Sequence, residues 1–301
     1  CAVVGASIGA LNGALLAQGD FDKAMRVWRD ISMEQVLDLG KPLEGGGNGN
    51  LLDFRNLEAV AREAIAKRGL DTTPLRQLIQ SVVDEEAVRA SSVDLGVTLF
   101  SLTSHASVEV FLEDIPQGQL ADYLLASASF PIFRKTEIGE EAYVDGGVGN
   151  NMPTGMLIGR GIQHIIEVDI CGVGWVPPVD LSEVRVVELR PSLPIGATFD
   201  LTPSVLEHSF RVGELDTLKA FGRLEGDGYF FQPDDYHELL RLFGARDVLG
   251  LQEAAKIYGV PQEEVYTLAT FVQALQDKRR LADQAYPLDS ERIGSFLEDP
   301  L

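Results

Sequence analysis

The stretch from Val3 to Asn12 constrains the fold of this chain more than any other part of its sequence. It reads VVGASIGALN, which predicts the end of a buried strand, a tight turn and the start of a helix. The residues from Gly5 to Gly9 form a G-x-S-x-G pattern, in which a serine occupies a sharp strand-to-helix turn with its hydroxyl exposed. The pattern therefore requires a sheet with a helix packed against it. A plain glycine-rich turn is the alternative for so short a motif.

A serine on such a turn is a candidate nucleophile. A hydroxyl is a poor nucleophile unless it is exposed, held still and placed beside a base. The turn forces Ser7 into strained backbone space, so we expect that Gly5 and Gly9 must be small to avoid a clash. The backbone amide of Ile8 stands at the start of the expected helix, where it can bind a developing oxyanion.

The G-x-S-x-G turn at residues 5–9 is called a nucleophile elbow. Two further motifs follow this elbow along the chain. Residues 126–131 read ASASFP, and residues 142–153 read AYVDGGVGNNMP, a short apolar strand that ends in an aspartate and two glycines. Taken alone, Asp145 is most simply a turn residue at the end of a strand, because Asp-Gly pairs often are. Its occurrence together with Ser7 and Pro131 favours a catalytic role.

The three motifs in this order resemble the patatin-like phospholipase family, and the resemblance extends from Ala2 to about Ile170. It implies an α/β fold, with a three-layer α/β/α arrangement, a mainly parallel central sheet and a C-terminal helical region. It also implies a serine hydrolase of lipid esters, of the phospholipase A or lipid acyl hydrolase type, that works through an acyl-enzyme. We expect no cofactor, and the sequence has no paired-histidine or C-x-x-C spacing that would indicate a metal site.

The resemblance assigns roles to particular residues. Ser7 matches the family nucleophile and Asp145 matches the family base, which together form a Ser–Asp dyad without histidine. An aspartate in water is a weak base, with a pKa of about 3.9, so it needs a short hydrogen bond to the hydroxyl in a site that limits water. The backbone of Ile8 is the oxyanion donor. The residues that support the motifs are Gly5, Gly9, Pro131, Gly146 and Gly147.

One departure from the family concerns the oxyanion loop. The family places a Gly-rich loop about one strand and one helix upstream of the elbow, whereas this sequence starts at Cys1, six residues before Ser7. We therefore expect the chain to be N-terminally truncated, without its first strand and Gly-rich loop. Residues 45–50, GGGNGN, lie downstream of the elbow and predict a flexible loop rather than a substitute.

The expected elements alternate between helix and strand, as they do in a parallel sheet covered on both faces. Helices are predicted at residues 8–18, after the capping residues Asp20 and Asp53, and at 119–129; strands are predicted at 93–99, 107–112, 164–170 and 184–189. The strands at 93–99 and 107–112 form a hairpin. We divide the chain into residues 1–204, a patatin-like catalytic domain lacking its first strand and Gly-rich loop, and residues 205–301, a C-terminal helical region.

Composition limits the partners. The chain has 301 residues, of which 45% are hydrophobic, and a net charge of −21, which argues against nucleic acid and against standing electrostatic attachment to anionic membranes. No run of eighteen apolar residues predicts a transmembrane segment. Two cysteines provide no disulfide framework. The expected partners are a lipid or acyl-ester substrate and a transient membrane or micelle surface, and the expected location is the cytoplasm, with peripheral contact at the membrane as an option.

Other candidate residues leave alternatives open. Two histidines, His208 and His237, follow Asp145 in the order of a Ser–Asp–His esterase, although both lie in helical patterns. Ser127 and Ser129 are rival nucleophiles without an elbow around them, and the acidic run at residues 84–86 predicts solvated carboxylates. A non-catalytic patatin-like protein that binds lipid or acts as a scaffold is the alternative from a different functional class.

Overall fold

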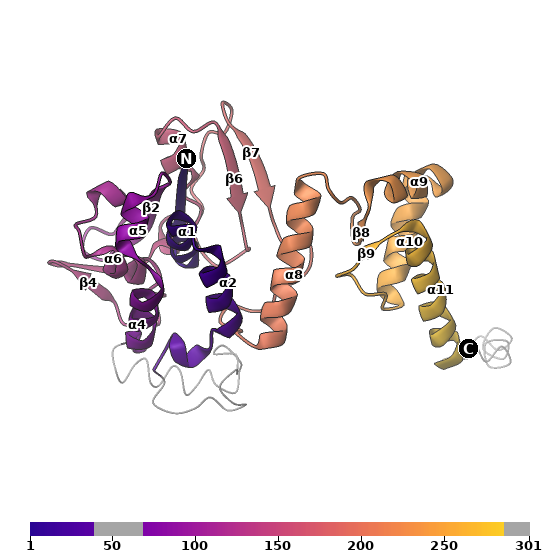
Figure 1. Cartoon of the computed structure of the whole chain (residues 1–301), viewed down its shortest axis with the longest axis horizontal. Helices are drawn as coiled ribbons and strands as arrows, with labels where there is room; N and C mark the ends of the chain where they lie inside the picture. The colour runs from indigo at the N-terminus through magenta and orange to yellow at the C-terminus, as the bar shows by residue number, and fades with distance from the viewer. Residues whose placement is uncertain (39–68, 286–301) are drawn as a thin grey trace, which may run out of the picture. The chain divides into compact units, whose positions relative to one another are not determined.

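The computed structural model describes residues 1–38 and 69–285 (Figure 1). The predicted loop at residues 45–50 and the helix predicted after Asp53 lie outside the described residues. The chain divides into two compact units, Cys1–Phe210 and Arg211–Leu301. Helix α8 (Pro203–Ala220) runs across this division, and the boundary predicted between residues 204 and 205 lies in its first turn. The assignment of a catalytic domain and a separate helical region stays a prediction.

A five-stranded sheet organises the first unit. Its strands are β1 (Ala2–Ala6), β2 (Asp94–Ser101), β3 (Ala106–Phe111), β4 (Thr136–Ile138) and β5 (Glu141–Asp145). The central strand β2 pairs with β3 along one edge in antiparallel register, from Gly96 to Ser101. Its other edge is shared. β1 pairs in parallel with residues 94–98, and β5 pairs antiparallel with residues 99–101.

The shared edge brings the ends of β1 and β5 together. Ala6, the last residue of β1, lies opposite Thr98, and Asp145, the last residue of β5, lies opposite Leu99. Because one strand runs parallel to β2 and the other antiparallel, the two strands point toward each other along the same edge. The residue that follows β1 therefore meets the residue that ends β5.

The sheet is mixed, so the prediction of a mainly parallel central sheet is wrong for this part of the fold. Three of its pairings, β2 with β3, β2 with β5 and β4 with β5, are antiparallel. Short connections are the physical reason for β2 with β3 and for β4 with β5, because a hairpin of a few residues can join only antiparallel strands. Gly139 and Glu140 alone connect β4 to β5, with Gly139 at φ 63°. A separate parallel pair is formed by β6 (His164–Val168) and β7 (Arg185–Leu189).

The α/β class and the three-layer arrangement are confirmed. Side chains alternate along β2, and one face packs into a core with α1 (Ile8–Gln18) and α6 (Leu120–Ser127). The fully buried residues of β2 on that face are Leu95, Val97 and Leu99. On the opposite face, the Thr98 hydroxyl lies 3.8 Å from the Met156 sulfur of α7 (Thr154–Gly159). Helices therefore cover both faces of the sheet (Figure 1).

Local signals account for the other helices of the first unit. They are α2 (Phe21–Asp30), α4 (Thr73–Val82) and α5 (Glu85–Ala90), together with the 3-10 turns η1 (Met33–Gln35), η2 (Leu112–Asp114) and η3 (Gly146–Val148). Helix α1 ends at Gln18 with Gly19 in the left-handed region, and the Asp20 side chain caps α2, as predicted. The prediction of solvated carboxylates is wrong at Glu85, which accepts hydrogen bonds from the Gly118 and Leu120 amides.

The second unit is mainly helical. It holds the end of α8, then β8 (Phe230–Phe231), α9 (Pro233–Phe243), α10 (Ala245–Ile257), β9 (Val265–Tyr266) and α11 (Leu268–Ala285). Its core is an aromatic cluster in which Phe271 packs edge-on against the rings of Tyr229, Phe231 and Tyr266. Across residues 1–38 and 69–285, no helix combines the length and apolar character that crossing a membrane requires.

Candidate active site

Ser7 occupies a strained turn between β1 and α1. Its backbone has φ 53° and ψ −126°, a conformation that residues with a Cβ rarely adopt. Hydrogen bonds hold the turn from both sides. The Ser7 amide donates to the Ser127 hydroxyl over 2.9 Å, and the Ser7 carbonyl accepts from the Ala10 amide over 3.0 Å. The strained conformation predicted for the elbow is therefore present, and its hydrogen bonds keep it in place.

The two glycines of the elbow differ in their surroundings. A Cβ on Gly5 would lie 2.3 Å from the Gly9 carbonyl carbon, so Gly5 must lack a side chain for the turn to close against α1. A Cβ on Gly9 would meet no atom within 4 Å. The steric requirement that we predicted at Gly9 is therefore wrong, because this position faces open space.

Asp145 lies directly beside Ser7, as the strand geometry requires. The Ser7 hydroxyl donates a hydrogen bond of 2.5 Å to Asp145 Oδ2. The other carboxylate oxygen, Oδ1, accepts from the Gly147 amide over 2.8 Å, and the Asp145 amide donates to the Ser129 carbonyl over 2.8 Å. Both carboxylate oxygens and the backbone of Asp145 are thus oriented by specific partners.

The surroundings of Asp145 change its acidity. The residue is 5% exposed, and burial raises the pKa of its carboxyl group above the ordinary value because the charged form loses its contact with water. Hydrogen bonds from the Ser7 hydroxyl and the Gly147 amide lower the pKa, but they offset only part of the effect of burial. A carboxylate with a raised pKa is a stronger proton acceptor than an aspartate in water.

The glycines after Asp145 allow a close backbone approach. A Cβ on Gly146 would lie 2.0 Å from the Thr98 carbonyl oxygen, and a Cβ on Gly147 would lie 2.7 Å from Asn151 Oδ1. No side chain fits at Gly146, so η3 packs directly against β2, whereas a side chain at Gly147 would require the Asn151 side chain to move. This packing places the Gly147 amide where it reaches the carboxylate of Asp145.

Ser127 and Ser129 are fully buried and have structural partners. Besides accepting from the Ser7 amide, the Ser127 hydroxyl donates to the Thr98 carbonyl over 2.7 Å. The Ser129 hydroxyl donates to the Leu125 carbonyl over 2.7 Å. Sequence reasoning treated both only as rival nucleophiles and missed the link from Ser127 to the elbow. The ASASFP motif marked the segment, but no local pattern indicates a partner 120 positions away.

The remaining predicted site residues lie around this centre. Ile8 is the first residue of α1, and the first amides of a helix have no intrahelical acceptor. Pro131 is exposed, in a turn closed by the hydrogen bond from the Phe133 amide to the Phe130 carbonyl. The structure thus groups Gly5, Ser7, Ile8, Asp145, Gly146 and Gly147 closely, whereas Pro131 contributes to the turn after Ser129.

The two histidines of the triad alternative have other partners. His208 Nε2 lies 2.7 Å from the Pro194 carbonyl oxygen, and His237 Nε2 pairs with Glu225 at 3.1 Å. The carboxylate of Asp145 is bonded to Ser7 and Gly147 instead. These contacts of His208 and His237 involve neither Ser7 nor Asp145.

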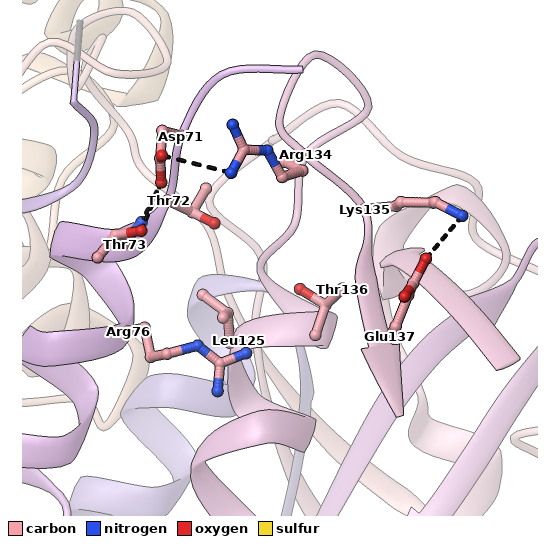
Figure 2. Close-up of a pocket in the computed structure, with 9 residues that line it drawn as sticks. All are labelled: Asp71, Thr72, Thr73, Arg76, Leu125, Arg134, Lys135, Thr136 and Glu137. Atoms are coloured by element: carbon pink, nitrogen blue, oxygen red, sulfur yellow. Dashed lines mark hydrogen bonds and ion pairs between the residues drawn. The ribbon is translucent and has the colours of Figure 1, made fainter. Parts of the chain in front are cut away.

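A polar hollow of about 530 Å³ lies between α4, α6 and β4 (Figure 2). Its charged side chains are paired, with Arg134 3.4 Å from Asp71 and Lys135 2.9 Å from Glu137. Leu125 is the single aliphatic side chain among its nine lining residues, and neither Ser7 nor Asp145 is one of them. Such a lining is poorly suited to an acyl chain, because the chain would displace water from charged groups without replacing its hydrogen bonds.

Comparison with known proteins identifies the family. The family model for patatin-like phospholipases matches residues 2–158, which include both the elbow and the Asp145 turn. The chain belongs to this family. Among solved structures, VipD from Legionella pneumophila matches with a TM-score of 0.41 and 12% identity, over 95% of this chain and 75% of the VipD chain. No curated protein matches. Patatin-like phospholipases generally hydrolyse lipid esters. Membership of this family therefore supports lipid acyl hydrolase activity at the family level.

The two elbow glycines of this patatin-like chain provide a matched test of the turn. We expect Gly5→Ala to lower the free energy of unfolding by about 3 kcal/mol or more, because its Cβ would collide with the backbone of α1. Gly9→Ala should leave stability unchanged or raise it by up to about 1 kcal/mol, because alanine favours a helix and the space is open. Urea denaturation measures the free energy of unfolding of both variants and of the parent. Equal losses in the two variants would contradict this description of the turn.

The raised pKa of Asp145 predicts a pH-dependent stability. Between the unfolded pKa, about 3.9, and the higher native pKa, the folded state binds more protons than the unfolded state. The contribution of Asp145 to stability therefore falls as pH rises through this window. Asparagine does not titrate, so the stability of Asp145→Asn relative to the parent should increase from about pH 4 to pH 7.

Urea denaturation at a series of pH values tests this prediction, with Asp180→Asn as the control. Hydrogen bonds from Ser182 lower the pKa of the exposed Asp180 carboxyl group, so its variant should show a slope that is near zero or of opposite sign. If the relative stability of Asp145→Asn falls as pH rises, the pKa of Asp145 is not raised.

Proposed function

We propose that the protein hydrolyses lipid esters through an acyl-enzyme on Ser7, with Asp145 as the general base. Its membership of the patatin-like phospholipase family supports the reaction class. The observation that carries the residue roles is the 2.5 Å hydrogen bond from the Ser7 hydroxyl to the buried carboxylate of Asp145. A nucleophile and a base within hydrogen-bond reach are the minimal arrangement for attack on an ester carbonyl.

In the first half of the proposed reaction, Ser7 Oγ attacks the ester carbonyl carbon while its proton passes to Asp145 Oδ2. The carbonyl oxygen takes the negative charge of the tetrahedral intermediate. Collapse of this intermediate breaks the bond to the alcohol oxygen, and the leaving alcohol takes the proton from Asp145. In the second half, water attacks the acyl–Ser7 ester, with Asp145 accepting and returning a proton in the same way, and the fatty acid leaves.

The environment of Asp145 supports its role as a base. In water a carboxylate would hold the serine proton too weakly to assist the attack, because its pKa lies far below that of a hydroxyl. Burial raises the pKa of Asp145, and the Gly147 amide keeps the carboxylate aimed at Ser7. The proton acceptor is therefore both stronger and better oriented than a solvated aspartate.

We assign one oxyanion donor to the backbone of Ile8. Nucleophile elbows use the amide that follows the nucleophile, and Ile8 is that residue at the start of α1. The Ser7 amide is committed elsewhere, because it donates to Ser127. The helix start adds a positive partial charge where the oxyanion forms.

Substitutions at the dyad and its support test the residue roles. Ser7→Ala should lower kcat for a short, water-soluble acyl ester by at least about 10³-fold, and Asp145→Asn by roughly 10²–10⁴-fold. Ser127→Ala should cost about tenfold to a hundredfold, because the elbow loses its bond to the hydroxyl while the nucleophile and the base remain.

Ser129→Ala is the matched control for Ser127→Ala. Ser129 is equally buried, but its hydroxyl contacts Leu125 and Thr136 rather than Ser7. This variant should stay within about threefold of the parent. Full activity of Ser7→Ala would end the proposal, and equal losses at Ser127 and Ser129 would remove the positioning role of Ser127.

A double variant separates the dyad from the triad alternative. His208→Gln with His237→Gln should keep activity within about tenfold, because neither side chain is bonded to Ser7 or Asp145. Glutamine at position 208 can still donate to the Pro194 carbonyl. A general base that is lost typically costs roughly 10²–10⁴-fold. A loss of that size with intact circular dichroism would favour a Ser–Asp–His esterase instead.

The non-catalytic alternative has its own signature. A lipid-binding or scaffold protein of this family would bind lipid vesicles without releasing fatty acid, and Ser7→Ala would change neither property. The short hydrogen bond between Ser7 and Asp145 argues against it, because a strained turn and a buried carboxylate both cost stability and bring no benefit to a scaffold.

A further inference from the structure

The segment after β6 exposes apolar side chains next to the candidate active site. Val173 is 81% exposed, Trp175 62% and Val176 53%. Tryptophan has a large apolar surface that usually finds cover in a folded protein or at an interface. Three such side chains within four residues form a local apolar tip, and we call residues 173–176 the apolar segment.

The apolar segment is tied to the turn that carries Asp145. The Trp175 amide donates to the Gly147 carbonyl over 2.8 Å, and the Asn151 amide donates to the Trp175 carbonyl over 2.7 Å. A Cβ on Gly174 would lie 2.8 Å from the Gly147 carbonyl oxygen, so the two backbones pack closely here. The exposed indole is therefore attached to a backbone held two residues from the carboxylate, and the position of the segment is linked to that of the site.

Charge indicates which kind of surface the segment can meet. Residues 161–184 contain no lysine or arginine, but they contain Glu167, Asp169, Asp180 and Glu183. The whole chain carries a net charge of −21. An anionic membrane would repel such a surface, because basic residues supply the attraction to anionic lipid. A zwitterionic lipid surface instead accepts aromatic and aliphatic side chains at the level of its headgroups.

We propose that the apolar segment is the lipid-docking surface of this protein, and that it inserts Val173, Trp175 and Val176 into a zwitterionic lipid interface. This inference rests on the proposed function, because docking here serves to place Ser7 and Asp145 at the surface that holds the ester substrate. The binding itself does not require catalysis. Transfer of the exposed indole and the two valines out of water supplies the free energy of docking.

Tryptophan fluorescence tests the docking directly. The chain has two tryptophans, Trp28 and Trp175, so Trp28→Phe leaves a single tryptophan, which lies in the apolar segment and can be excited selectively. In a Ser7→Ala background, which prevents hydrolysis, phosphatidylcholine vesicles should shift its emission to the blue. Lipids brominated in the acyl chain should quench it. An unshifted emission, with no quenching at any vesicle concentration, would overturn the proposal.

A pair of charge substitutions provides the matched control. Val173→Asp should weaken binding to phosphatidylcholine vesicles by about tenfold or more, because it places a charge in the inserted segment. Ile257→Asp introduces the same charge at a side chain that is 82% exposed on α10 in the second unit, and it should leave binding unchanged. Equal effects of the two substitutions would show that net charge, rather than the apolar segment, controls binding.

Two activity measurements separate this inference from the proposed function. Val173→Asp should lower the hydrolysis of phosphatidylcholine in vesicles about tenfold while leaving kcat/KM for a water-soluble short ester within twofold of the parent. Hydrolysis of neither substrate by the parent would end the proposed function but not the binding result. An equal loss on both substrates would mean that Val173 acts on the site and not on docking.

Two further outcomes would show that the apolar segment binds something other than a zwitterionic lipid surface. Tighter binding to phosphatidylglycerol vesicles than to phosphatidylcholine vesicles would exclude a zwitterionic surface as the preferred partner. A dimer in size-exclusion chromatography that Val173→Asp dissociates, and that vesicles do not compete with, would show that a second copy of the chain covers the segment instead.

Discussion

The pairing of two oppositely directed strands with one edge of β2 is the constraint on which the site depends. β1 and β5 approach each other along that edge and end at Thr98 and Leu99. The hydroxyl that follows one strand therefore meets the carboxylate that ends the other, at 2.5 Å. If β5 were parallel to β1, their C-terminal ends could not meet head to head in this way. The mixed sheet is thus the direct cause of the contact between Ser7 and Asp145.

Two features at this contact are unfavourable for stability. Ser7 has a backbone conformation that is costly for a residue with a side chain, and Asp145 has a carboxylate removed from water. Ser7 is supported by a hydrogen bond from a distant segment, and Asp145 by one from its own turn. The Ser127 hydroxyl binds the Ser7 amide, and the Gly147 amide binds the Asp145 carboxylate. Strain that is stabilised in this way is typical of sites that perform chemistry.

The turn after Asp145 connects the chemistry to the proposed docking surface. Gly147 uses its amide to hold the carboxylate and its carbonyl to accept from the Trp175 amide. A displacement of the apolar segment at a lipid surface would therefore reach the proposed base, Asp145, through a single residue, Gly147.

Local chemistry was enough to predict the elbow, helix α1 with its Gly19 end, the Asp20 cap and the β2–β3 hairpin, because each depends on residues close in sequence. The motifs also named Ser7 and Asp145 as partners. The sequence alone did not determine the direction of the other strands, the open space at Gly9, or the structural use of Ser127 and Glu85. Those features depend on which segments meet in space, and contacts between residues 120 or 138 positions apart leave no local pattern to read.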